Sequence, residues 1–381
     1  MKEFILPSIY WIVAFFVTLP ARCRKRHKNL MLVSEKGNDA RDNGYHFFLY
    51  VRQQHPEVDA YYVITDDSPD RNRLAQYEDH LVRYLSFRHC CLFWKAHYLV
   101  GTHLRAGHTP LPFVVVSRLN RLLNIYKDKK VANIKHGITK NFIDRMAYER
   151  TRYNLLVCGA VPERDYFVER YGYPESVARY TGFCRFDRLS DFQVKRQILV
   201  MPTWRSYIPP DRITASRFYQ AYHALLTRLD ALLEQYDIDL VFYPHHRFQP
   251  VCGQFKSGVT SPRIVVADLQ HYDVQQLLKD SAVMITDYSS VLFDFVYMRK
   301  PVLFYQFDRD EFLSRHFKPG YIGEESFGPV SMDVDGLLEQ LTLCLEGGMQ
   351  LAPPYAAKVS EFFPLHDTDN CKRVFDAVMH C

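Results

Sequence analysis

The sequence lacks the cysteine and histidine spacings that signal a structural metal. Its 381 residues include nine cysteines, but no CxxC pair and no CxxC followed by HxxxH occurs among them. This pattern predicts neither a zinc site nor a disulfide framework. Low-complexity stretches are absent too, which excludes a long disordered linker. We interpret the cysteines as reduced thiols in the body of a cytosolic protein.

The apolar run at the N-terminus is short for a membrane span. Phe4–Leu19 is apolar and aromatic, but a spanning helix needs about 20 such residues. A cleavable secretory signal carries its positive charge before the apolar part and a small-x-small cleavage site after it. Here only Lys2 precedes the apolar part, and the positive charge follows it, in Arg22, Arg24, Lys25, Arg26 and Lys28. The pattern therefore disfavours secretion.

Three alternatives remain for this N-terminal segment. It is a peripheral anchor with Trp11, Phe15 and Phe16 at the acyl boundary and the basic cluster on an anionic membrane surface, a single span, or a core helix of the first domain. We predict the anchor, which makes residues 1–29 a membrane-associating segment at the cytoplasmic face of the cell membrane. The basic run lies beside an apolar segment and not among exposed stacking aromatics, so we expect no nucleic-acid partner.

The length predicts two domains, because a single hydrophobic core stops growing at about 250–300 residues. Hydrophobic residues make up 48% and charged residues 24% of the chain, as in folded globular proteins. Apolar strand-length runs alternate with helix-length segments in both halves, which is typical of parallel sheets. Strands are expected at Leu30–Val33, Ala60–Thr65, Tyr98–Gly101, Ala132–Lys135, Leu155–Cys158, Gln197–Met201, Leu240–Tyr243, Ile264–Val266, Val283–Thr286 and Pro301–Tyr305.

The second half also shows clear helical segments, expected at Ala215–Glu234, Val274–Lys279, Val291–Met298 and Val334–Leu345. Gly182–Gln193 is the best linker candidate, because it has a glycine, several charges and no periodicity. We therefore predict an α/β fold with two doubly wound parallel-sheet domains, at residues 30–190 and 191–381. Two such domains facing a cleft would bind ligands at the carboxyl ends of their strands.

The strongest local signal is a buried strand that ends in a polar turn, Thr286-Asp287-Tyr288-Ser289-Ser290. The two serines start the next expected helix. Free backbone NH groups and two hydroxyls at a helix start suit a pyrophosphate. The alternative is that Asp287 or Ser289 simply caps the helix. We favour a phosphate-binding turn, because the whole polar cluster follows a strand of the second domain.

Two histidines stand where expected strands end, one in each half. His136 precedes Gly137, and this pair at a strand-to-loop junction exposes the imidazole and lets a substrate approach the backbone. Such a histidine suits a general base near neutral pH. The second lies in Pro244-His245-His246-Arg247. The alternative for any one of the 16 histidines is an ordinary surface or capping residue. We assign catalysis to His136 and His245 and not to His246.

Charged residues follow other expected strands. Arg205 ends Pro202-Thr203-Trp204-Arg205, where it offers a fixed positive charge for phosphate, and a structural salt bridge is the alternative. Arg185 and Asp187 are candidates for a hinge ion pair. Asp308, beyond Lys300-Pro301-Val302-Leu303-Phe304-Tyr305, either lines a nucleotide pocket or caps the next helix.

The order of these motifs resembles the CDP-glycerol glycerophosphotransferases, which build teichoic acids and related capsule polymers. The motifs are His-Gly-x-Thr at 136, Gly-x-x-Arg-x-Asp at 182, Pro-Thr-Trp-Arg at 202, Pro-His at 244, Thr-Asp-Tyr-Ser-Ser-x-x-Phe-Asp at 286 and Lys-Pro-Val-x-Phe-Tyr at 300. The similarity runs from Ser34-Glu35-Lys36-Gly37 to Asp308. The element that ends at Asp294 is rather specific, whereas His-Gly alone is weak. The resemblance implies a GT-B fold, a peripheral membrane location, and no obligatory metal or other cofactor.

The resemblance also implies residue roles. His136 matches the histidine proposed as the base, His245 the one near the donor phosphates, and Ser289 and Ser290 the phosphate-binding serines. Further expected site residues are Thr286 and Arg205 at the donor phosphates, and Asp287, Asp294, Arg247, Asp308 and Gly137 elsewhere in the cleft. Two departures stand out. The family often has Trp-His-Gly-Thr followed by Pro and Lys, where this chain has Lys135-His136-Gly137-Ile138-Thr139-Lys140-Asn141. Tyr243 replaces an arginine, so Arg247 or Arg205 would clamp the phosphate.

The activity that this resemblance implies is transfer of glycerol phosphate from CDP-glycerol to a hydroxyl of a cell-surface or capsule polymer, or of its lipid-linked precursor. His136 would take the acceptor proton, and His245 and Arg205 would stabilise the departing CMP. The cytidine would lie near the loop after Tyr305. The same residues would serve CDP-ribitol or a nucleotide sugar in another GT-B transferase. A non-catalytic membrane-bound binding protein is a second alternative, which the joint presence of both histidines and both serines disfavours.

Overall fold

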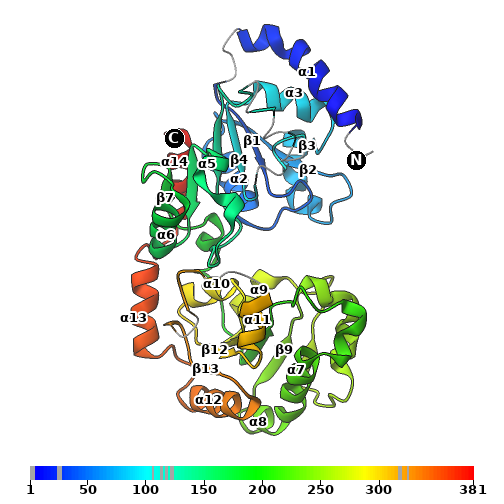
Figure 1. Ribbon diagram of the computed structural model, residues 1–381, viewed down its shortest axis with the longest axis vertical. Helices are drawn as coiled ribbons and strands as arrows, with labels where there is room; N and C mark the ends of the chain where they lie inside the picture. The colour runs from blue at the N-terminus through cyan, green and yellow to red at the C-terminus, as the bar shows by residue number, and fades with distance from the viewer. Residues whose placement is uncertain are drawn as a thin grey trace. The chain divides into compact units, whose positions relative to one another are not determined.

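The computed structural model of the protein describes residues 5–23, 28–104, 107–111, 115, 119–120, 124–315, 320–323 and 326–381. The chain divides into two compact units (Figure 1). Unit 1 comprises Met1–Ile138, Ile143–Arg188 and Asp367–Cys381, and unit 2 comprises Thr139–Phe142 and Leu189–His366. The expected domains, 30–190 and 191–381, differ from this division chiefly at the C-terminus, because the last residues of the chain return to unit 1.

Unit 1 is built on a parallel sheet with the strand order β3-β2-β1-β4-β5-β6-β7. The strands are β1 Leu30–Ser34, β2 Asp59–Ile64, β3 Leu81–Arg83, β4 Tyr98–Gly101, β5 Lys130–Asn133, β6 Leu155–Cys158 and β7 Ala178–Tyr180. The central strands β1 and β4 are buried along their whole length, as expected for a sheet covered on both faces. The strand order reverses between β1 and β4, so the topological switch point lies there.

Helices and 3-10 helices connect the strands of unit 1. They are α2 Asn43–Gln54, α3 Phe87–Lys95, α5 Tyr148–Thr151, α6 Val161–Tyr171, η2 Arg71–His80, η3 Asp144–Met146 and η4 Cys184–Arg188. The start of α2 is fixed by the buried carboxylate of Glu35, which accepts hydrogen bonds from Asp42 N at 2.8 Å and Tyr45 N at 3.0 Å. This contact satisfies NH groups that a helix start leaves free, and it ties the loop after β1 to the sheet edge.

Unit 2 repeats this architecture with a parallel sheet in the order β10-β9-β8-β11-β12-β13. Its strands are β8 Gln197–Met201, β9 Asp239–Phe242, β10 Ile264–Val266, β11 Val283–Thr286, β12 Val302–Tyr305 and β13 Val330–Ser331. Its helices are α7 Arg217–Arg228, α8 Asp230–Gln235, α9 Val274–Asp280, α10 Leu292–Tyr297, α11 Arg309–Arg315, α12 Val334–Glu346 and α13 Pro353–Phe362, with η5 Pro210–Ala215 and η6 His246–Lys256. The switch point of this sheet lies between β8 and β11.

The expected fold class, α/β with two doubly wound parallel sheets, is confirmed. Each strand expected from the sequence is present, and the expected helix Ala215–Glu234 is divided into α7 and α8. The short edge strands β3, β7 and β13 were not predicted, because two or three residues carry no readable period. The boundary between the units falls inside the expected linker Gly182–Gln193, but the first part of that range is packed into unit 1. Phe183 and Phe186 are fully buried in unit 1, and the chain enters unit 2 only at Leu189.

The N-terminal helix α1, Ile5–Cys23, lies against α3 in unit 1 (Figure 1). The ring centroids of Trp11 and Trp94 are 4.5 Å apart, and Trp94 Nε1 donates a hydrogen bond to Trp11 O at 2.9 Å. Trp11 is therefore buried, at 8% exposure. This corrects the expectation that Trp11 faces the membrane, because the tryptophan pair forms the contact between α1 and α3.

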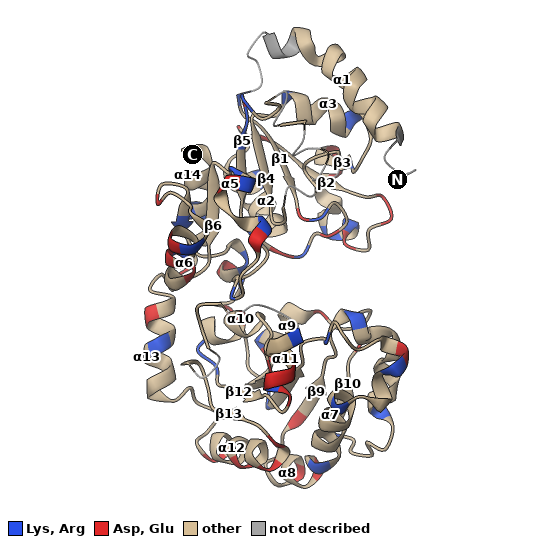
Figure 2. Cartoon of the chain, in the orientation of Figure 1, with Lys and Arg blue, Asp and Glu red and all other residues tan. Residues whose placement is uncertain are grey.

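The opposite face of α1 is apolar and exposed. Residues at helical spacing form it, namely Leu6, Ile9, Ile12, Val13, Phe16 and Val17. Figure 2 draws most of α1 in tan, because its residues 6–20 include no Lys, Arg, Asp or Glu. Within the described ranges, no helix has both the length and the hydropathy needed to cross a membrane. Arg24, Lys25 and Arg26 of the basic run lie outside those ranges.

The C-terminal helix α14, Asn370–Met379, returns the chain to unit 1. Asp187 binds its start, because Oδ1 accepts from Asn370 N and Oδ2 from Cys371 N, both at 2.8 Å. Gly182 has φ +75°, and a Cβ there would lie 1.8 Å from Asn370 Oδ1. The glycine and the aspartate of the Gly-x-x-Arg-x-Asp motif thus anchor α14. Asp187 holds the start of this helix.

Candidate active site

The conspicuous motifs of unit 2 lie on both sides of its switch point. β8 and β11 are neighbours, and Met201 pairs with Thr286 where the two strands end. The segments that follow, Pro202-Thr203-Trp204-Arg205 and Asp287-Tyr288-Ser289-Ser290, therefore start from the same edge of the sheet. Doubly wound sheets bind their ligands at this edge.

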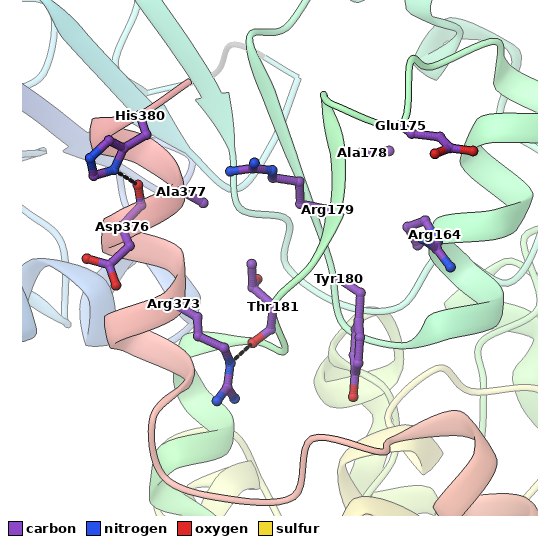
Figure 3. A pocket seen from close by; sticks show the side chains of 10 residues that line it. All are labelled: Arg164, Glu175, Ala178, Arg179, Tyr180, Thr181, Arg373, Asp376, Ala377 and His380. Atoms are coloured by element: carbon purple, nitrogen blue, oxygen red, sulfur yellow. Dashed lines mark hydrogen bonds between the residues drawn. The ribbon is translucent and has the colours of Figure 1, made fainter.

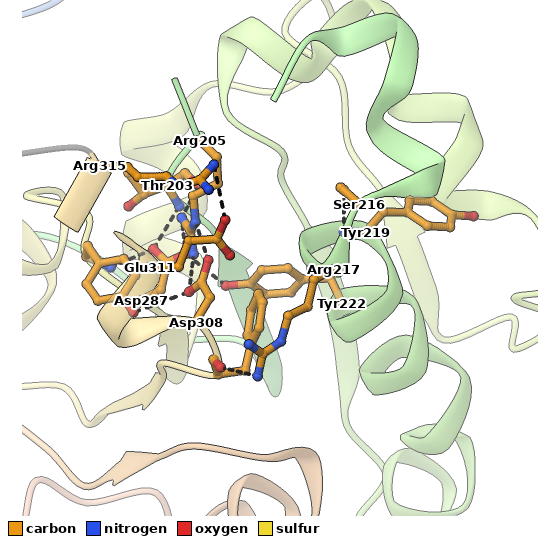
Figure 4. Close-up of polar contacts among 12 residues, drawn as sticks. Thr203, Arg205, Ser216, Arg217, Tyr219, Tyr222, Asp287, Asp308, Glu311 and Arg315 are labelled. Carbon is orange, nitrogen blue, oxygen red and sulfur yellow. Dashed lines mark hydrogen bonds and ion pairs between the residues drawn. The ribbon is translucent and has the colours of Figure 1, made fainter. Parts of the chain in front are cut away.

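Arg205 lies inside an ion-pair network (Figure 4). Its Nε and Nη2 donate to the two carboxylate oxygens of Asp308 at 2.7 and 3.0 Å, and its Nη1 lies 2.9 Å from Asp287 Oδ2. Nη1 also donates to Thr203 O at 2.6 Å. The side chain is 0% exposed. Burial by itself lowers the pKa of Arg205, but Asp287 and then Asp308 outweigh it and raise the pKa, so the guanidinium stays charged.

The neighbours of Arg205 are equally engaged within unit 2. Asp287 Oδ1 accepts from Thr203 N at 2.8 Å, and Oδ2 accepts from Tyr222 Oη at 3.1 Å. Thr286 Oγ1 donates to Met201 O at 2.7 Å, which joins β11 to β8. These side chains support the edge of the sheet from within.

The predicted ligand contacts of four residues are therefore corrected. Arg205 and Thr286 were expected at the donor phosphates, and Asp287 and Asp308 in the cleft, but all four are buried and bind other protein groups. The reason is electrostatic. A buried guanidinium requires paired carboxylates, and two aspartates supply them. The structural salt bridge, which the sequence left open for Arg205, is what the structure contains.

The two serines are the part of this motif that reaches solvent. Ser290 is exposed and Ser289 is half-buried. Ser289 Oγ accepts a hydrogen bond from Val291 N at 3.4 Å, so its own hydrogen is directed elsewhere. Asp294, expected in the cleft, is instead 4% exposed within α10. Two hydroxyls and the turn that carries them remain available for a ligand at this edge.

His245 follows the neighbouring strand β9. Its ring stacks on Trp204 with the centroids 5.9 Å apart and the planes inclined by 19°. Arg247 N donates to His245 Nδ1 at 3.3 Å. Because Nδ1 accepts, the proton of a neutral His245 lies on Nε2, which is then a donor. The exposed Arg247 places its guanidinium carbon 5.4 Å from the Trp204 ring. His245, Trp204 and Arg247 thus form one cluster beside the switch point.

In unit 1, the loops after β1, β4 and β5 leave the sheet at one edge, because Ser34 pairs with Gly101 and Gly101 with Asn133. His136 lies in the loop after β5 and is exposed. The residue before it, Lys135, has φ 51°, a left-handed conformation that is uncommon for lysine. His136 thus directly follows a residue in a left-handed backbone conformation.

Buried partners hold Lys135 in that conformation. Asn133 Oδ1 accepts from Lys135 N at 2.9 Å, and Asn43 Nδ2 donates to Lys135 O at 2.8 Å. The Lys135 side chain forms a buried ion pair with Glu163. Strain of this kind persists only where the surroundings enforce it, and it concentrates at functional sites.

Arg185 holds the carbonyl of the predicted base. Its Nη1 donates to His136 O at 2.9 Å and to Asp42 Oδ1 at 2.8 Å. A Cβ at Gly137 would meet only Arg185 Nη2, at 3.8 Å. The glycine therefore leaves open space beside His136, as the expected approach of a substrate to the backbone requires.

His136 is unprotonated at neutral pH. The surrounding protein, and then the positive charges of Lys135 and Arg185, lower the pKa of His136 to about 4. Solvent at the exposed part of the ring tempers this shift without reversing it. His103, from the loop after β4, stacks on His136 with ring centroids 4.4 Å apart. The imidazole can accept a proton from a substrate hydroxyl.

A cavity of about 670 Å³ lies elsewhere in unit 1, beside β7 (Figure 3). It is lined by Arg164, Glu175, Ala178, Arg179, Tyr180, Thr181, Arg373, Asp376, Ala377 and His380, and none of the predicted site residues is among them. Arg373 donates to Thr181 O at 2.9 Å and binds Asp367 and Asn370. That arginine supports α14, and the cavity is separate from the candidate site.

A comparison with protein families covers the chain almost from end to end. The family described as CDP-Glycerol:Poly(glycerophosphate) glycerophosphotransferase matches residues 15–380. The chain belongs to this family. The match includes the histidine motifs of both units and the serine turn of unit 2, and it confirms the resemblance expected from the sequence.

Curated proteins named for teichoic acid synthesis are similar to this chain. The minor teichoic acid biosynthesis protein GgaB of Bacillus subtilis (strain 168) is 29% identical over 373 residues, which cover 92% of this chain and 40% of that protein. A teichoic acid glycerol-phosphate transferase of Staphylococcus aureus (strain NCTC 8325 / PS 47) is 24% identical over 260 residues, covering 63% of this chain and 64% of that protein. The chain spans less than two thirds of the length of these relatives.

Solved structures show the same fold. The wall teichoic acid polymerase TagF has a TM-score of 0.66 at 16% identity, with 98% of this chain and 92% of that chain covered. A putative UDP-N-acetylglucosamine 2-epimerase from Listeria monocytogenes has a TM-score of 0.60 at 15% identity, with 92% and 96% covered. At these identities the likeness concerns the fold alone, two parallel sheets of the GT-B-like kind.

Sequence reasoning missed two features of the unit 1 edge. His103 had a visible signal, because it stands two residues after the correctly expected strand Tyr98–Gly101, which borders the switch point. The left-handed turn at Lys135 had none. Its partners Asn43 and Glu163 are distant in the chain, and no local pattern announces such a contact.

Proposed function

We propose that this chain transfers glycerol phosphate from CDP-glycerol to a hydroxyl of a cell-surface polymer or of its lipid-linked precursor, and releases CMP. The observation that carries this proposal is the family match over residues 15–380. It is supported by the positions of His136, His245, Ser289 and Ser290, which all follow strands at or next to a switch point. Similar curated proteins are named for teichoic acid synthesis.

In the proposed reaction, the acceptor oxygen forms a bond to the phosphorus that carries glycerol. The bond from that phosphorus to the bridging oxygen breaks, and its electron pair leaves on CMP. The acceptor proton passes to the unprotonated His136. Ser289 and Ser290 donate to the diphosphate, and Nε2–H of His245 donates to the departing phosphate. Positioning and charge stabilisation supply most of the catalysis in phosphoryl transfer.

Arg205 takes a different part from the one expected. It is a positioning residue, because it acts on the turn through Asp287 and Asp308. The exposed Arg247 is the candidate cation for the phosphate, since its guanidinium lies over Trp204 beside His245.

We further propose that the reaction takes place on an anionic membrane surface. The support is the exposed apolar face of α1, on which Phe16 is 63% exposed and Ile12 55%. An interfacial helix lays such a face at the level of the headgroup and acyl boundary. The basic run Arg22–Lys28 that follows in the sequence would meet anionic headgroups.

The experiment is a donor panel. The purified chain is incubated with CDP-glycerol, CDP-ribitol and nucleotide sugars, together with a glycerol-phosphate oligomer as acceptor, and products are followed by phosphorus NMR. CMP and a new phosphodiester from CDP-glycerol are expected, with loss of both in His136→Ala. His97→Ala is the matched control, because His97 precedes β4 at the opposite end of the sheet. Turnover of CDP-ribitol or a nucleotide sugar in place of CDP-glycerol would contradict the donor assignment. Donor binding without any turnover would favour a binding protein.

A further inference from the structure

Two imidazole rings stack face to face at the carboxyl edge of the unit 1 sheet. The centroids of His103 and His136 are 4.4 Å apart and their planes are inclined by 10°. His103 lies in the loop after β4, and His136 in the loop after β5. The stack therefore joins two loops beside the switch point. His103 belongs to none of the motifs that carry the family resemblance.

Thr102 contacts both rings of this pair. Its Oγ1 lies 2.8 Å from His103 Nδ1, and its backbone partly opposes the lowering of the His136 pKa. The face of the His136 ring is covered by His103, and its nitrogens lie at the edge of the stack. Since a general base needs a fixed second contact to keep its free nitrogen aligned, this arrangement has the geometry of an oriented base.

We propose that His103 is a positioning residue for His136. The His103 ring packs against the His136 imidazole and holds it with one nitrogen free for the acceptor hydroxyl. The inference rests on the proposed function, in which His136 takes the proton of that hydroxyl. His103 exchanges no proton with the substrate. Its contribution is to orient the base and to cover one face of it against water.

The charges that face the stack come from three elements. Lys36 follows β1, Lys135 adjoins His136 on the loop after β5, and Arg185 of η4 binds His136 O. Each has an acidic partner, in Asp39, Glu163 and Asp42 respectively. The surroundings are thus positive or balanced, and they disfavour a second cation in the pair.

The protonation state agrees with this role. Desolvation, and then the neighbouring His136 and Lys36, lower the pKa of His103 to about 3, and that of His136 lies near 4. Two positive rings at this separation would repel each other, so the pair accepts its protons in two separate steps. Both rings are therefore neutral at pH 7, and His136 is exposed whereas His103 is half-buried.

Matched variants separate the ring of His103 from its titration. His103→Ala removes the ring that stacks on His136, whereas His103→Phe keeps a flat ring there and removes only the titratable group. His97→Ala is the control for loss of an imidazole from the other end of β4. Thr102→Val removes the hydroxyl next to His103 Nδ1 and serves if His103→Ala does not fold.

The first readout is the pKa of His136, measured by NMR titration of its ring protons and assigned with His136→Ala. This measurement requires no substrate, so it tests the contact even if no transfer activity is found. In His103→Ala, water reaches the face of the His136 ring that His103 covers in the wild type. The His136 pKa should therefore rise by about one unit or more toward its ordinary value. His103→Phe should keep it within about half a unit.

The second readout is the pH–rate profile of glycerophosphate transfer. His103→Ala should lower kcat by about 10-fold or more and move the acidic limb to higher pH, with little change in the KM for CDP-glycerol. His103→Phe should retain kcat within about 3-fold. A His136 pKa and profile unchanged in His103→Ala would overturn the proposal, and so would a His103→Phe protein that is folded and as slow as His103→Ala. Absence of all transfer by the wild type would instead refute the proposed function.

Discussion

At the carboxyl edge of the unit 1 sheet, the predicted base His136 is exposed, whereas at the same edge of unit 2 Arg205 is 0% exposed and binds two aspartates. In unit 1 the strained turn and the bound carbonyl present a reactive side chain to solvent. In unit 2 most of the motif supports the turn, and only Ser289 and Ser290 reach outward. Motif residues at equivalent edges can therefore display a ligand-binding group or support the group that does.

The largest effect is expected where the supporting network of unit 2 is broken. Arg205→Met leaves Asp287 and Asp308 buried without their cation, which should cost about 3–5 kcal/mol of unfolding free energy. Denaturant unfolding followed by Trp204 fluorescence measures it, in a background where Trp11 and Trp94 of unit 1 are replaced by phenylalanine. The exposed Arg247→Met is the control, with an expected change below about 1 kcal/mol. A loss of similar size in both variants would erase the contrast between the two units.

The displayed groups should affect turnover more than stability. His136→Ala and His245→Ala should each lower kcat by at least about 100-fold, because each removes a proton acceptor or a charge-stabilising donor. Unfolding curves should stay close to the wild type, since His136 is exposed and His245 half-buried. Steady-state kinetics with CDP-glycerol provide the measurement. Near-normal rates in either variant would remove that histidine from the proposed mechanism.

Both units contain a lysine that binds carbonyl groups at the end of a helix, and loss of this lysine should destabilise both units equally. Lys129 Nζ donates to Phe93 O, Trp94 O and Ala96 O at the end of α3, and Lys300 Nζ donates to Leu278 O, Lys279 O and Ser281 O at the end of α9. Each lysine donates hydrogen bonds to carbonyl groups that a helix end leaves without a partner in the helix. Lys129→Met and Lys300→Met should each cost about 2–3 kcal/mol. A loss confined to one unit would show that the resemblance is only geometric.

The pH dependence of Lys300 refines this test. Burial lowers the pKa of Lys300 from 10.5 to about 7, against the opposing charge of Asp280. Between those values the unfolded chain binds a proton that the folded chain releases, and the neutral amine of Lys300 then donates at most two of its three hydrogen bonds. The stability of the wild type relative to Lys300→Met should therefore rise with pH from about 7 to 10.5, by up to about 1.4 kcal/mol per pH unit. A flat difference would mean that Lys300 stays charged in the folded protein.

The exposed apolar surfaces of the two units should differ in membrane binding. Phe16→Asp on α1 should weaken binding to vesicles of anionic phospholipid by about 10-fold or more, because it removes apolar area from the proposed interfacial face. Leu343→Asp on α12 is the matched control, since Leu343 is 55% exposed in unit 2 but lies outside that face. Co-sedimentation at low salt measures both. Equal binding of all three proteins would place the membrane contact elsewhere.

The fold and the location of the site could be predicted from the sequence. Which motif residues contact a ligand and which support the turn could not. Continuous apolar runs revealed the central strands, because strands buried on both faces lack a polar face. Polar residues directly after them marked the edges where ligands bind. Whether Arg205 meets a phosphate or two aspartates depends on Asp308, about one hundred positions away. That pairing arises only in the folded chain.

The C-terminal helix and the stacked histidines were beyond reach for the same reason. α14 has a readable apolar face, yet its return to unit 1 depends on Asp187 at its start and on the glycine turn at Gly182. His103 was placed beside a known strand end, but its contact with His136 requires the register between β4 and β5. Local patterns predict elements, and contacts between distant elements decide which side chains are free to react.

The assignment of the donor phosphates to unit 2 and of the base to unit 1 is tested by calorimetric titration of CDP-glycerol into the wild type, Ser289→Ala/Ser290→Ala and His136→Ala. Because solvent reaches Ser290, loss of the two hydroxyl donors should cost about 1 kcal/mol or less each, and the double variant should bind the donor roughly 10-fold more weakly. His136→Ala should bind CDP-glycerol as tightly as the wild type while it loses turnover. The opposite result, with full donor affinity in the serine variant and reduced affinity in His136→Ala, would contradict the assignment of donor phosphates to unit 2 and of the base to unit 1.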